Sequence, residues 1–231
     1  MLLNVGLITA SINFQSNQKS EIILSRSNQN NDDLHGNAPD NSPAALLIID
    51  MINDLEFEDG EKLERPARAA AEHIAALKAR CKQAGMAIIY CNDNFGRWRS
   101  DFREVVDRVL NDGVRGEPLA KLLDPAEDDY FVLKPKHSAF FETTLETLLR
   151  YLGAKRLILT GITGDICVLI SASDAYMRDY EIYVPVDCTA SVEAAENEHA
   201  LDYMERVLKA TVIGAEDLDV RQLMRASDAG S

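Results

Sequence analysis

Several kinds of residue are scarce in this chain of 231 residues, and each shortage argues against a class of protein. The four cysteines are widely spaced and include no Cys-x-x-Cys pair, so we expect reduced thiols rather than a disulfide framework. No apolar run approaches the roughly 20 residues of a transmembrane helix. Basic residues number 24 against 38 acidic ones, and the formal net charge of -14 disfavours nucleic acid and membrane partners. The start of the chain lacks the basic segment and cleavage site of a signal peptide, which predicts a cytoplasmic protein.

A polar segment precedes the part of the chain that can form a core. Residues 12–43 are rich in Asn, Ser, Gln and Asp and contain too few apolar residues to pack alone. The sequence therefore predicts a flexible extension at 1–43 and one domain at 44–231, whose length suits a single α/β domain.

From residue 44 onward, short apolar runs alternate with helical patterns. The runs predict strands at 44–50, 86–92, 130–134, 156–160, 181–186 and 211–214. Helices are predicted between and after them, at 64–84, 100–110, 141–152, 166–178, 192–208 and 215–225. Strands that are apolar throughout and separated by helices indicate a parallel sheet covered on both faces. We therefore expect a single three-layer α/β/α domain, Rossmann-like, with an open, mostly parallel, six-stranded sheet.

Three chemically different side chains follow three of these strands. Asp50 ends the first strand, Lys134 ends the third, and Cys167 follows the fourth after the turn at 161–164. Because ligands of open parallel sheets bind beyond the carboxyl ends of the strands, the three groups should converge on one crevice. This set suits an activated cysteine nucleophile, with Asp50 as the base and Lys134 as an electrostatic stabiliser. The thiol would lie in the first turn of a helix, where the helix dipole and unpaired amides favour the thiolate.

The segments near these residues should border the same crevice. Asn92, Phe95 and Trp98 follow the second strand, and His137 follows Lys134 by three residues, so all four are candidates for a substrate pocket. Trp98 could alternatively belong to the core or an interface, and His137 could make a structural hydrogen bond from its loop.

Four segments resemble the isochorismatase-like cysteine hydrolase family in their order and spacing. They are 46–54 (LLIIDMIND), 134–140 (KPKHSAF), 160–168 (TGITGDICV) and, more weakly, 184–191 (VPVDCTAS). The resemblance implies the isochorismatase-like hydrolase fold and a catalytic triad of Cys167, Lys134 and Asp50. It also implies a cis peptide bond between Ile162 and Thr163, and an oxyanion hole formed by the backbone N–H groups of Thr163 and Cys167.

The activity that this resemblance implies is hydrolysis of an amide-type C–N bond in a small molecule, through a thioester on Cys167. The resemblance implies no cofactor. It implies that the protein forms a homo-oligomer. Nicotinamidases of the family carry a metal-binding Asp-x-His segment after the second strand, whereas residues 92–101 contain no histidine, so we expect no zinc-type site. Two alternatives stay open. One is a vinyl-ether hydrolase in which Asp50 acts as an acid, and the other is a non-catalytic protein that binds a small molecule or senses oxidants through its thiol.

Overall fold

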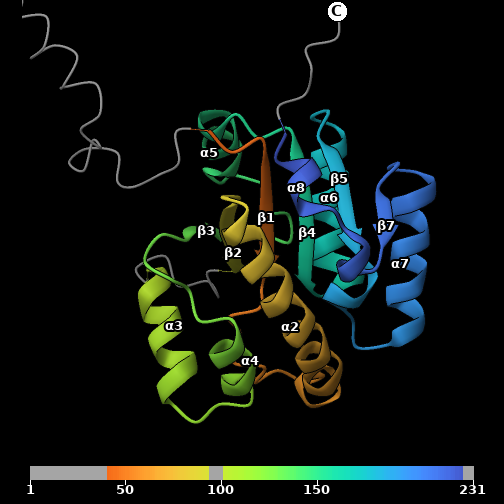
Figure 1. Cartoon of the computed structure of the whole chain (residues 1–231). Coiled ribbons are helices and arrows are strands. Elements are labelled where there is room, and N and C mark those ends of the chain that lie inside the picture. The colour runs from red at the N-terminus through yellow and green to blue at the C-terminus, as the bar shows by residue number, and fades with distance from the viewer. Residues whose placement is uncertain (1–40, 94–100, 226–231) are drawn as a thin grey trace, which may run out of the picture. The chain divides into compact units, whose positions relative to one another are not determined.

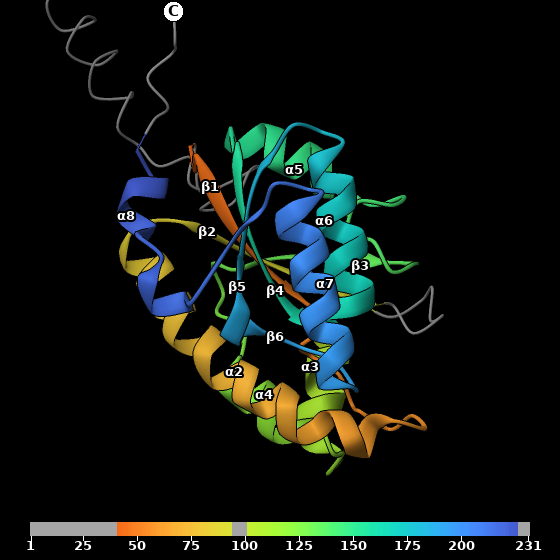
Figure 2. The ribbon, with the colours of Figure 1, turned by 90° about the vertical axis from the view of Figure 1, so that its right-hand side faces the viewer.

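The computed structural model describes residues 41–93 and 101–225, so most of the predicted extension lies outside the described residues. Figure 1 and Figure 2 show a central sheet with helices on both faces. Its strands are β1 (Ala44–Ile49), β2 (Ala87–Asp93), β3 (Tyr130–Lys134), β4 (Arg156–Ile162), β5 (Glu181–Pro185), β6 (Thr189–Ala190) and β7 (Thr211–Ile213). The order across the sheet is β3-β2-β1-β4-β5-β7, with β6 paired to the end of β4, and every pair is parallel.

The predicted three-layer α/β/α architecture is confirmed, but the sheet has seven strands rather than the expected six. The additional strand, β6, consists of only two residues, Thr189 and Ala190. A strand this short cannot display an apolar pattern of its own, because such patterns need about four residues or more to be recognised. The other six strands lie within a few residues of their predicted positions.

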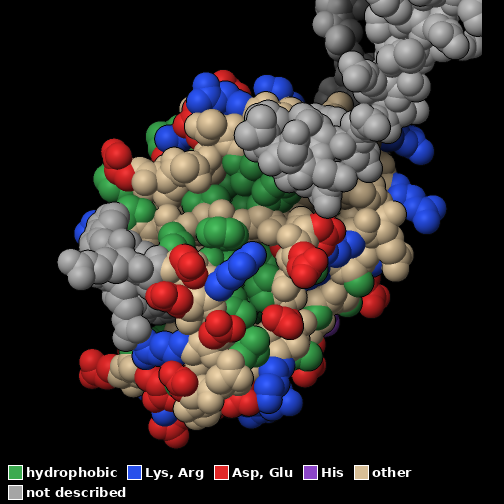
Figure 3. Space-filling view, turned by 90° about the vertical axis from the view of Figure 1, so that its left-hand side faces the viewer, with side chains coloured by type: hydrophobic (Ala, Val, Ile, Leu, Met, Phe, Trp, Pro, Cys, Tyr) green, Lys and Arg blue, Asp and Glu red, His purple; other side chains and the backbone are tan. Residues whose placement is uncertain are grey.

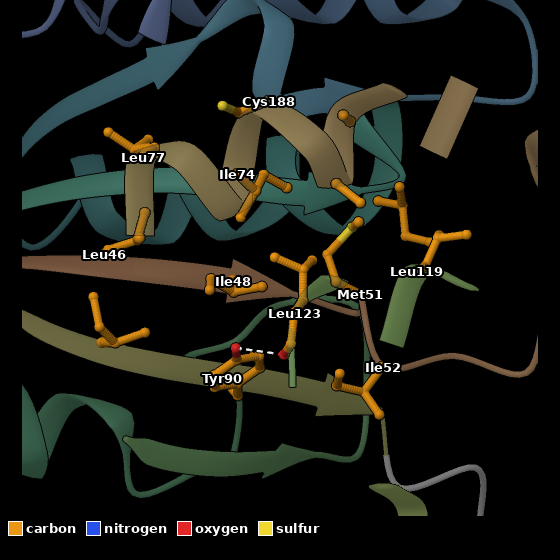
Figure 4. Close-up of a cluster of buried hydrophobic side chains, with 14 of the residues drawn as sticks. Leu46, Ile48, Met51, Ile52, Ile74, Leu77, Tyr90, Leu119, Leu123 and Cys188 are labelled. Carbon is orange, nitrogen blue, oxygen red and sulfur yellow. Dashed lines mark hydrogen bonds between the residues drawn. The ribbon is translucent and has the colours of Figure 1, made fainter. Parts of the chain in front are cut away.

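Two groups of helices cover the two faces of the sheet (Figure 2). One face carries α2 (Gly60–Gln83), α3 (Phe102–Asn111), α4 (Glu117–Leu122) and α8 (Val220–Leu223), and the other carries α5 (Leu145–Leu152), α6 (Leu169–Tyr176) and α7 (Ala194–Arg206). Successive side chains of β1 point to opposite faces, so Leu46 and Ile48 join one core cluster while Leu47 and Ile49 join the other. Figure 4 shows the first cluster, in which the buried Tyr90 hydroxyl donates a 2.7 Å hydrogen bond to the Leu123 carbonyl oxygen.

Helix boundaries differ from the predicted ones in several places, and α5 begins at Leu145, four residues after its predicted start. Helix α2 begins at Gly60, four residues before the predicted start, and α4 is a six-residue helix that the sequence patterns miss because it is too short to show periodicity. The helix expected at 215–225 is a 3-10 turn, Ala215–Asp217, followed by α8. Within residues 41–93 and 101–225, no helix combines the length and apolar character needed to cross a bilayer.

Strand β3 forms one edge of the sheet, on the side of the molecule that Figure 3 faces. Phe131 of β3 is half exposed and stacks on Phe102 of α3, with 5.2 Å between the ring centroids. Figure 3 shows apolar side chains in the middle of this face, among acidic and basic ones. The opposite edge of the sheet is β7.

Candidate active site

Asp50, Lys134 and Cys167 lie together beyond the carboxyl ends of β1, β3 and β4. The Lys134 Nζ atom is 2.7 Å from Asp50 Oδ2 and 3.7 Å from Cys167 Sγ. Asp50 also forms a hydrogen bond with the thiol of Cys167. The structure therefore brings the predicted acid, ammonium and thiol into mutual contact at the edge of the sheet where the fold rule places a ligand.

The backbone where β1 ends fixes the position of Asp50. Asp50 adopts a left-handed conformation with φ of 53°, which aspartate tolerates better than most residues. Its Oδ1 atom accepts a 2.8 Å hydrogen bond from the Asp93 amide, while Oδ2 contacts Lys134. Beside it on β4, Gly161 has φ of 122°, and a Cβ there would lie 2.0 Å from the Ile49 carbonyl oxygen. Only glycine therefore lets β4 pass β1 this closely before the chain reaches Cys167.

Lys134 is completely buried, and its ammonium group interacts with several neighbouring groups at once. Besides Asp50 and Cys167, its Nζ donates to the Lys136 carbonyl oxygen at 3.2 Å and lies 3.9 Å from Asp93 Oδ2. Burial opposes the charged form, but the carboxylates of Asp50 and Asp93, with the hydrogen bond to Asp50, outweigh it and raise the pKa of Lys134. The side chain therefore stays an ammonium ion.

Cys167 lies in a π-helical turn, Gly164–Val168, rather than in the first turn of an α-helix. The Val168 amide donates to the Thr163 carbonyl oxygen at 3.1 Å, which closes this wider turn before α6 begins. Burial, reinforced by the charge of Asp50, raises the pKa of the Cys167 thiol to about 12, and Lys134 opposes this only in part. The predicted helical position favours the thiolate, but burial and the charge of Asp50 act in the opposite direction. The thiol is protonated at neutral pH, and its use as a nucleophile requires a base.

Asp50 has the properties of such a base. Burial raises the pKa of its carboxyl group, although Lys134 and the hydrogen bonds from Cys167 and Asp93 oppose that shift. A carboxylate with a raised pKa accepts a proton more readily than a solvent-exposed one. Lys134 contacts both Asp50 and Cys167 and so holds the base beside the thiol.

A polar network supports the turn that carries Cys167, and sequence reasoning did not find it. The Asp165 amide donates to Ser191 Oγ at 3.1 Å, Ser191 Oγ lies 3.1 Å from Asn197 Oδ1, and Asn197 Nδ2 donates to Thr189 Oγ1 at 3.3 Å. A Cβ at Gly164 would lie 2.0 Å from Asn197 Oδ1, so α7 packs directly on the turn. Thr189 and Ser191 lie in the weaker family match at 184–191, but no sequence pattern connects them with Asn197 of α7.

The four residues predicted to line a substrate pocket differ in where they lie. Asn92 is completely buried, and its Nδ2 donates to the Ile52 carbonyl oxygen at 2.7 Å, which ties β2 to the loop after β1. Phe95 and Trp98 lie outside the described residues. His137 is exposed, and its Nδ1 lies 3.8 Å from Cys167 Sγ.

Two further features of the site bear on the expectations from the sequence. The peptide bond between Ile162 and Thr163 is cis. Among the residues that the structure describes, no group of three or more His, Cys, Asp or Glu side chains is arranged to hold a metal ion.

Comparison with known proteins identifies the family of this chain. The isochorismatase domain model matches residues 44–217. An uncharacterized isochorismatase family protein, YaaI of Bacillus subtilis (strain 168), is 45% identical over 174 residues, which cover 75% of this chain and 95% of that protein. An isochorismatase of the same organism is 31% identical over 190 residues, 80% of this chain but only 60% of the relative.

A solved structure extends the likeness to the fold. The nicotinamidase/pyrazinamidase PncA of Bacillus subtilis superposes with a TM-score of 0.59 at 28% identity, covering 74% of this chain and 98% of that one. The family match extends over about three quarters of the chain and includes Asp50, Lys134 and Cys167. The chain therefore belongs to the isochorismatase-like family, whose members are generally hydrolases.

Proposed function

We propose that this protein is a cysteine hydrolase that cleaves an amide-type C–N bond of a small molecule. The observation that carries the proposal is the contact of Lys134 Nζ with both Asp50 Oδ2, at 2.7 Å, and Cys167 Sγ, at 3.7 Å. A nucleophile, a base and a fixed positive charge in mutual contact are what acyl transfer through a covalent intermediate requires. The structural similarity to a protein named nicotinamidase/pyrazinamidase is consistent with an amide substrate.

The proposed reaction begins with the protonated thiol. Asp50 accepts the thiol proton while Sγ forms a bond to the carbonyl carbon, and Lys134 stabilises the negative charge that passes between sulfur and carboxylate. The backbone N–H groups of Thr163 and Cys167 are the proposed donors to the tetrahedral oxyanion. The C–N bond then breaks as the leaving amine takes the proton from Asp50. Water hydrolyses the resulting thioester and releases a carboxylic acid and the free thiol.

Vinyl-ether hydrolysis is the second candidate, because the matching domain family is named for isochorismatase. The raised pKa of Asp50 also suits a carboxyl group that donates a proton. In that reaction Cys167 would form no covalent bond. The thiol-sensing alternative loses support, because an oxidant sensor needs a readily ionised thiol, whereas burial raises the pKa of Cys167 to about 12.

The test is a panel of small primary amides and ureido compounds, followed by ammonia release. We expect turnover by the wild-type protein, at least a roughly thousandfold loss in Cys167→Ala, and a thioester adduct on Cys167 detectable by mass spectrometry. Cys81→Ala, which alters a buried thiol on α2, is the matched control and should remain active. Full activity in Cys167→Ala would exclude a sulfur nucleophile and leave the vinyl-ether reaction as the candidate to test.

A further inference from the structure

We propose that His137 is a further catalytic residue of this site, the base that activates water for hydrolysis of the Cys167 thioester. The inference rests on the proposed cysteine hydrolase function. The geometry that carries it is the 3.8 Å contact between His137 Nδ1 and Cys167 Sγ, which places an imidazole beside the atom that would bear the acyl group. Asp50 and Lys134, the other groups around the sulfur, are both buried, whereas His137 is exposed.

This difference in exposure decides where the water can enter. Both carboxylate oxygens of Asp50 are already engaged, Oδ1 by the Asp93 amide and Oδ2 by Lys134. Lys134 itself has no exposed surface. Cys167 is itself only partly buried, so water has access to a thioester there beside the exposed imidazole of His137. An imidazole suits the task there, because one ring nitrogen accepts a proton while the other donates one.

The chain on both sides of His137 is fixed, so the imidazole does not depend on a free loop for its position. On one side, the Lys136 carbonyl oxygen accepts a 3.2 Å hydrogen bond from Lys134 Nζ. On the other side, Ser138 Oγ donates to Asp174 Oδ2 at 2.5 Å, and the Ala139 amide donates to Ser171 Oγ at 2.9 Å. Ser171 and Asp174 belong to α6, the helix that directly follows the turn of Cys167. The same helix thus connects the nucleophile and the histidine.

In the proposed deacylation step, His137 first acts as a base and then as an acid. Neutral His137 removes a proton from water as the water oxygen forms a bond to the thioester carbonyl carbon. The tetrahedral species collapses with cleavage of the C–S bond, the carboxylic acid product leaves, and the sulfur recovers its proton from the imidazolium. Asp50 has already passed its proton to the amine in the first half of the reaction, so both bases return to their starting states. In this scheme, Asp50 transfers the proton during acylation of Cys167, and His137 transfers the proton during hydrolysis of the thioester.

The test uses p-nitrophenyl acetate, an activated acyl donor that should acetylate Cys167 without the natural substrate. The wild-type protein should release nitrophenolate continuously. His137→Asn and His137→Phe should instead release about one equivalent in a burst, followed by a steady state roughly a hundredfold slower, because acetylation persists while deacylation fails. Mass spectrometry should find acetyl-Cys167 accumulated only in these variants. His199→Asn, at an exposed histidine of α7, is the matched control and should behave as wild type.

Three results would overturn the proposal, and they differ from one another. Unchanged turnover in both His137 variants would show that another base activates the water. A burst reduced in proportion to the steady state would show that His137 matters only for the structure of the site. Nitrophenolate release that is no faster with the wild-type protein than with Cys167→Ala would overturn the thioester function on which this inference rests.

Discussion

Among the residues that the structure describes, two lysine–aspartate pairs have side chains with little solvent exposure, and one of them lies at the candidate active site. Lys134 and Asp50 are 2.7 Å apart at the carboxyl ends of the strands, with side chains 0% and 7% exposed. Lys78 and Asp129, also 2.7 Å apart, join α2 to the start of β3, with side chains 11% and 1% exposed. Distance and burial therefore do not distinguish the two pairs.

What differs is the balance of charge around each pair. Asp129 contacts a second ammonium, Lys82 Nζ, at 2.9 Å, and Lys78 also donates to Tyr90 Oη and to the Asp124 carbonyl oxygen. At the other pair, one ammonium is shared by two carboxylates, those of Asp50 and Asp93, and by the thiol of Cys167. The first arrangement satisfies its charges, whereas the second holds a protonated thiol beside a carboxylate with a raised pKa. A buried ion pair becomes useful for proton transfer when a group beside it still has a proton to give.

The largest expected contrast between the pairs is in activity. We expect Lys134→Met to lower kcat/KM by at least about a thousandfold, because it removes the charge that stabilises the thiolate and leaves Asp50 beside it unpaired. Lys78→Met removes an ammonium of similar burial and should leave kcat/KM within about a factor of three, since surface and distant core changes do not alter the reacting groups. Steady-state kinetics with p-nitrophenyl acetate would measure both. Equal losses in the two variants would show that the lysines act only through folding.

The second contrast is in stability, measured by urea denaturation at pH 7. Removing one partner of a buried ion pair typically costs about 3–5 kcal/mol, which we expect for Lys134→Met. Lys78→Met should cost less, because Lys82 remains 2.9 Å from Asp129 to balance its charge. The double substitution Lys134→Met/Asp50→Asn should recover much of the loss without recovering activity, since asparagine carries no charge and tolerates a φ of 53°. A double variant no more stable than Lys134→Met would contradict this account.

The sequence predicted the reactive pair far better than the structural one. Apolar runs ending in Asp50 and Lys134 define two strand ends, and the rule that parallel strands share one carboxyl edge then places both residues at one crevice. Nothing comparable marks Lys78, which lies within an ordinary helix and meets Asp129 only through the packing of α2 against the start of β3. Residues at strand ends can be placed by topology alone, whereas contacts between helix faces and loops depend on how the layers pack.

The protonation state of Cys167 could not be predicted from the sequence, because it too depends on packing. Its place after a Gly-rich turn indicates an N-terminal helical position, which normally lowers a thiol pKa. The depth of its burial and the charge of Asp50 beside it act in the opposite direction and prevail. Both quantities belong to the packed site, as do the supporting contacts of Ser191 and Asn197. Pattern reasoning therefore found which residues meet, but not the electrostatic state in which they meet.

A third experiment compares two thiols, Cys167 and Cys81, whose pKa values are similarly raised but for partly different reasons. Burial raises the pKa of both Cys167 and Cys81 to about 12, but a neighbouring carboxylate contributes only at Cys167, whereas the nearby charge at Cys81 is that of Arg80. Asp50→Asn removes that carboxylate charge and should lower the pKa of Cys167, so that iodoacetamide alkylation at pH 9 becomes about tenfold faster per unit of pKa change. Peptide mapping across pH would follow both thiols, with Cys81 as the internal control. Slower alkylation of Cys167 in Asp50→Asn would mean that Asp50 assists ionisation more than its charge opposes it.

The smallest expected effect concerns Tyr90, the hydroxyl partner of the structural pair. Burial, together with the charges of Asp129 and Asp124, raises the pKa of Tyr90 well above its ordinary value of 10.0. Above pH 10 the unfolded chain therefore releases this proton while the folded protein retains it, so the free energy of unfolding falls as pH rises, by about 1.4 kcal/mol per pH unit. At pH 7 the free energy of unfolding of Tyr90→Phe should be about 1–2 kcal/mol lower than that of the wild type, because the hydrogen bonds with Leu123 and Lys78 are lost. Between pH 10 and 11 the free energy of unfolding should fall less in the variant than in the wild type, because phenylalanine has no proton to release. Urea denaturation of both proteins at pH 7, 10 and 11 measures this difference. Equal falls in the free energy of unfolding would assign the sensitivity to alkaline pH to other groups. Lys134 is one of them, because its raised pKa acts in the same direction.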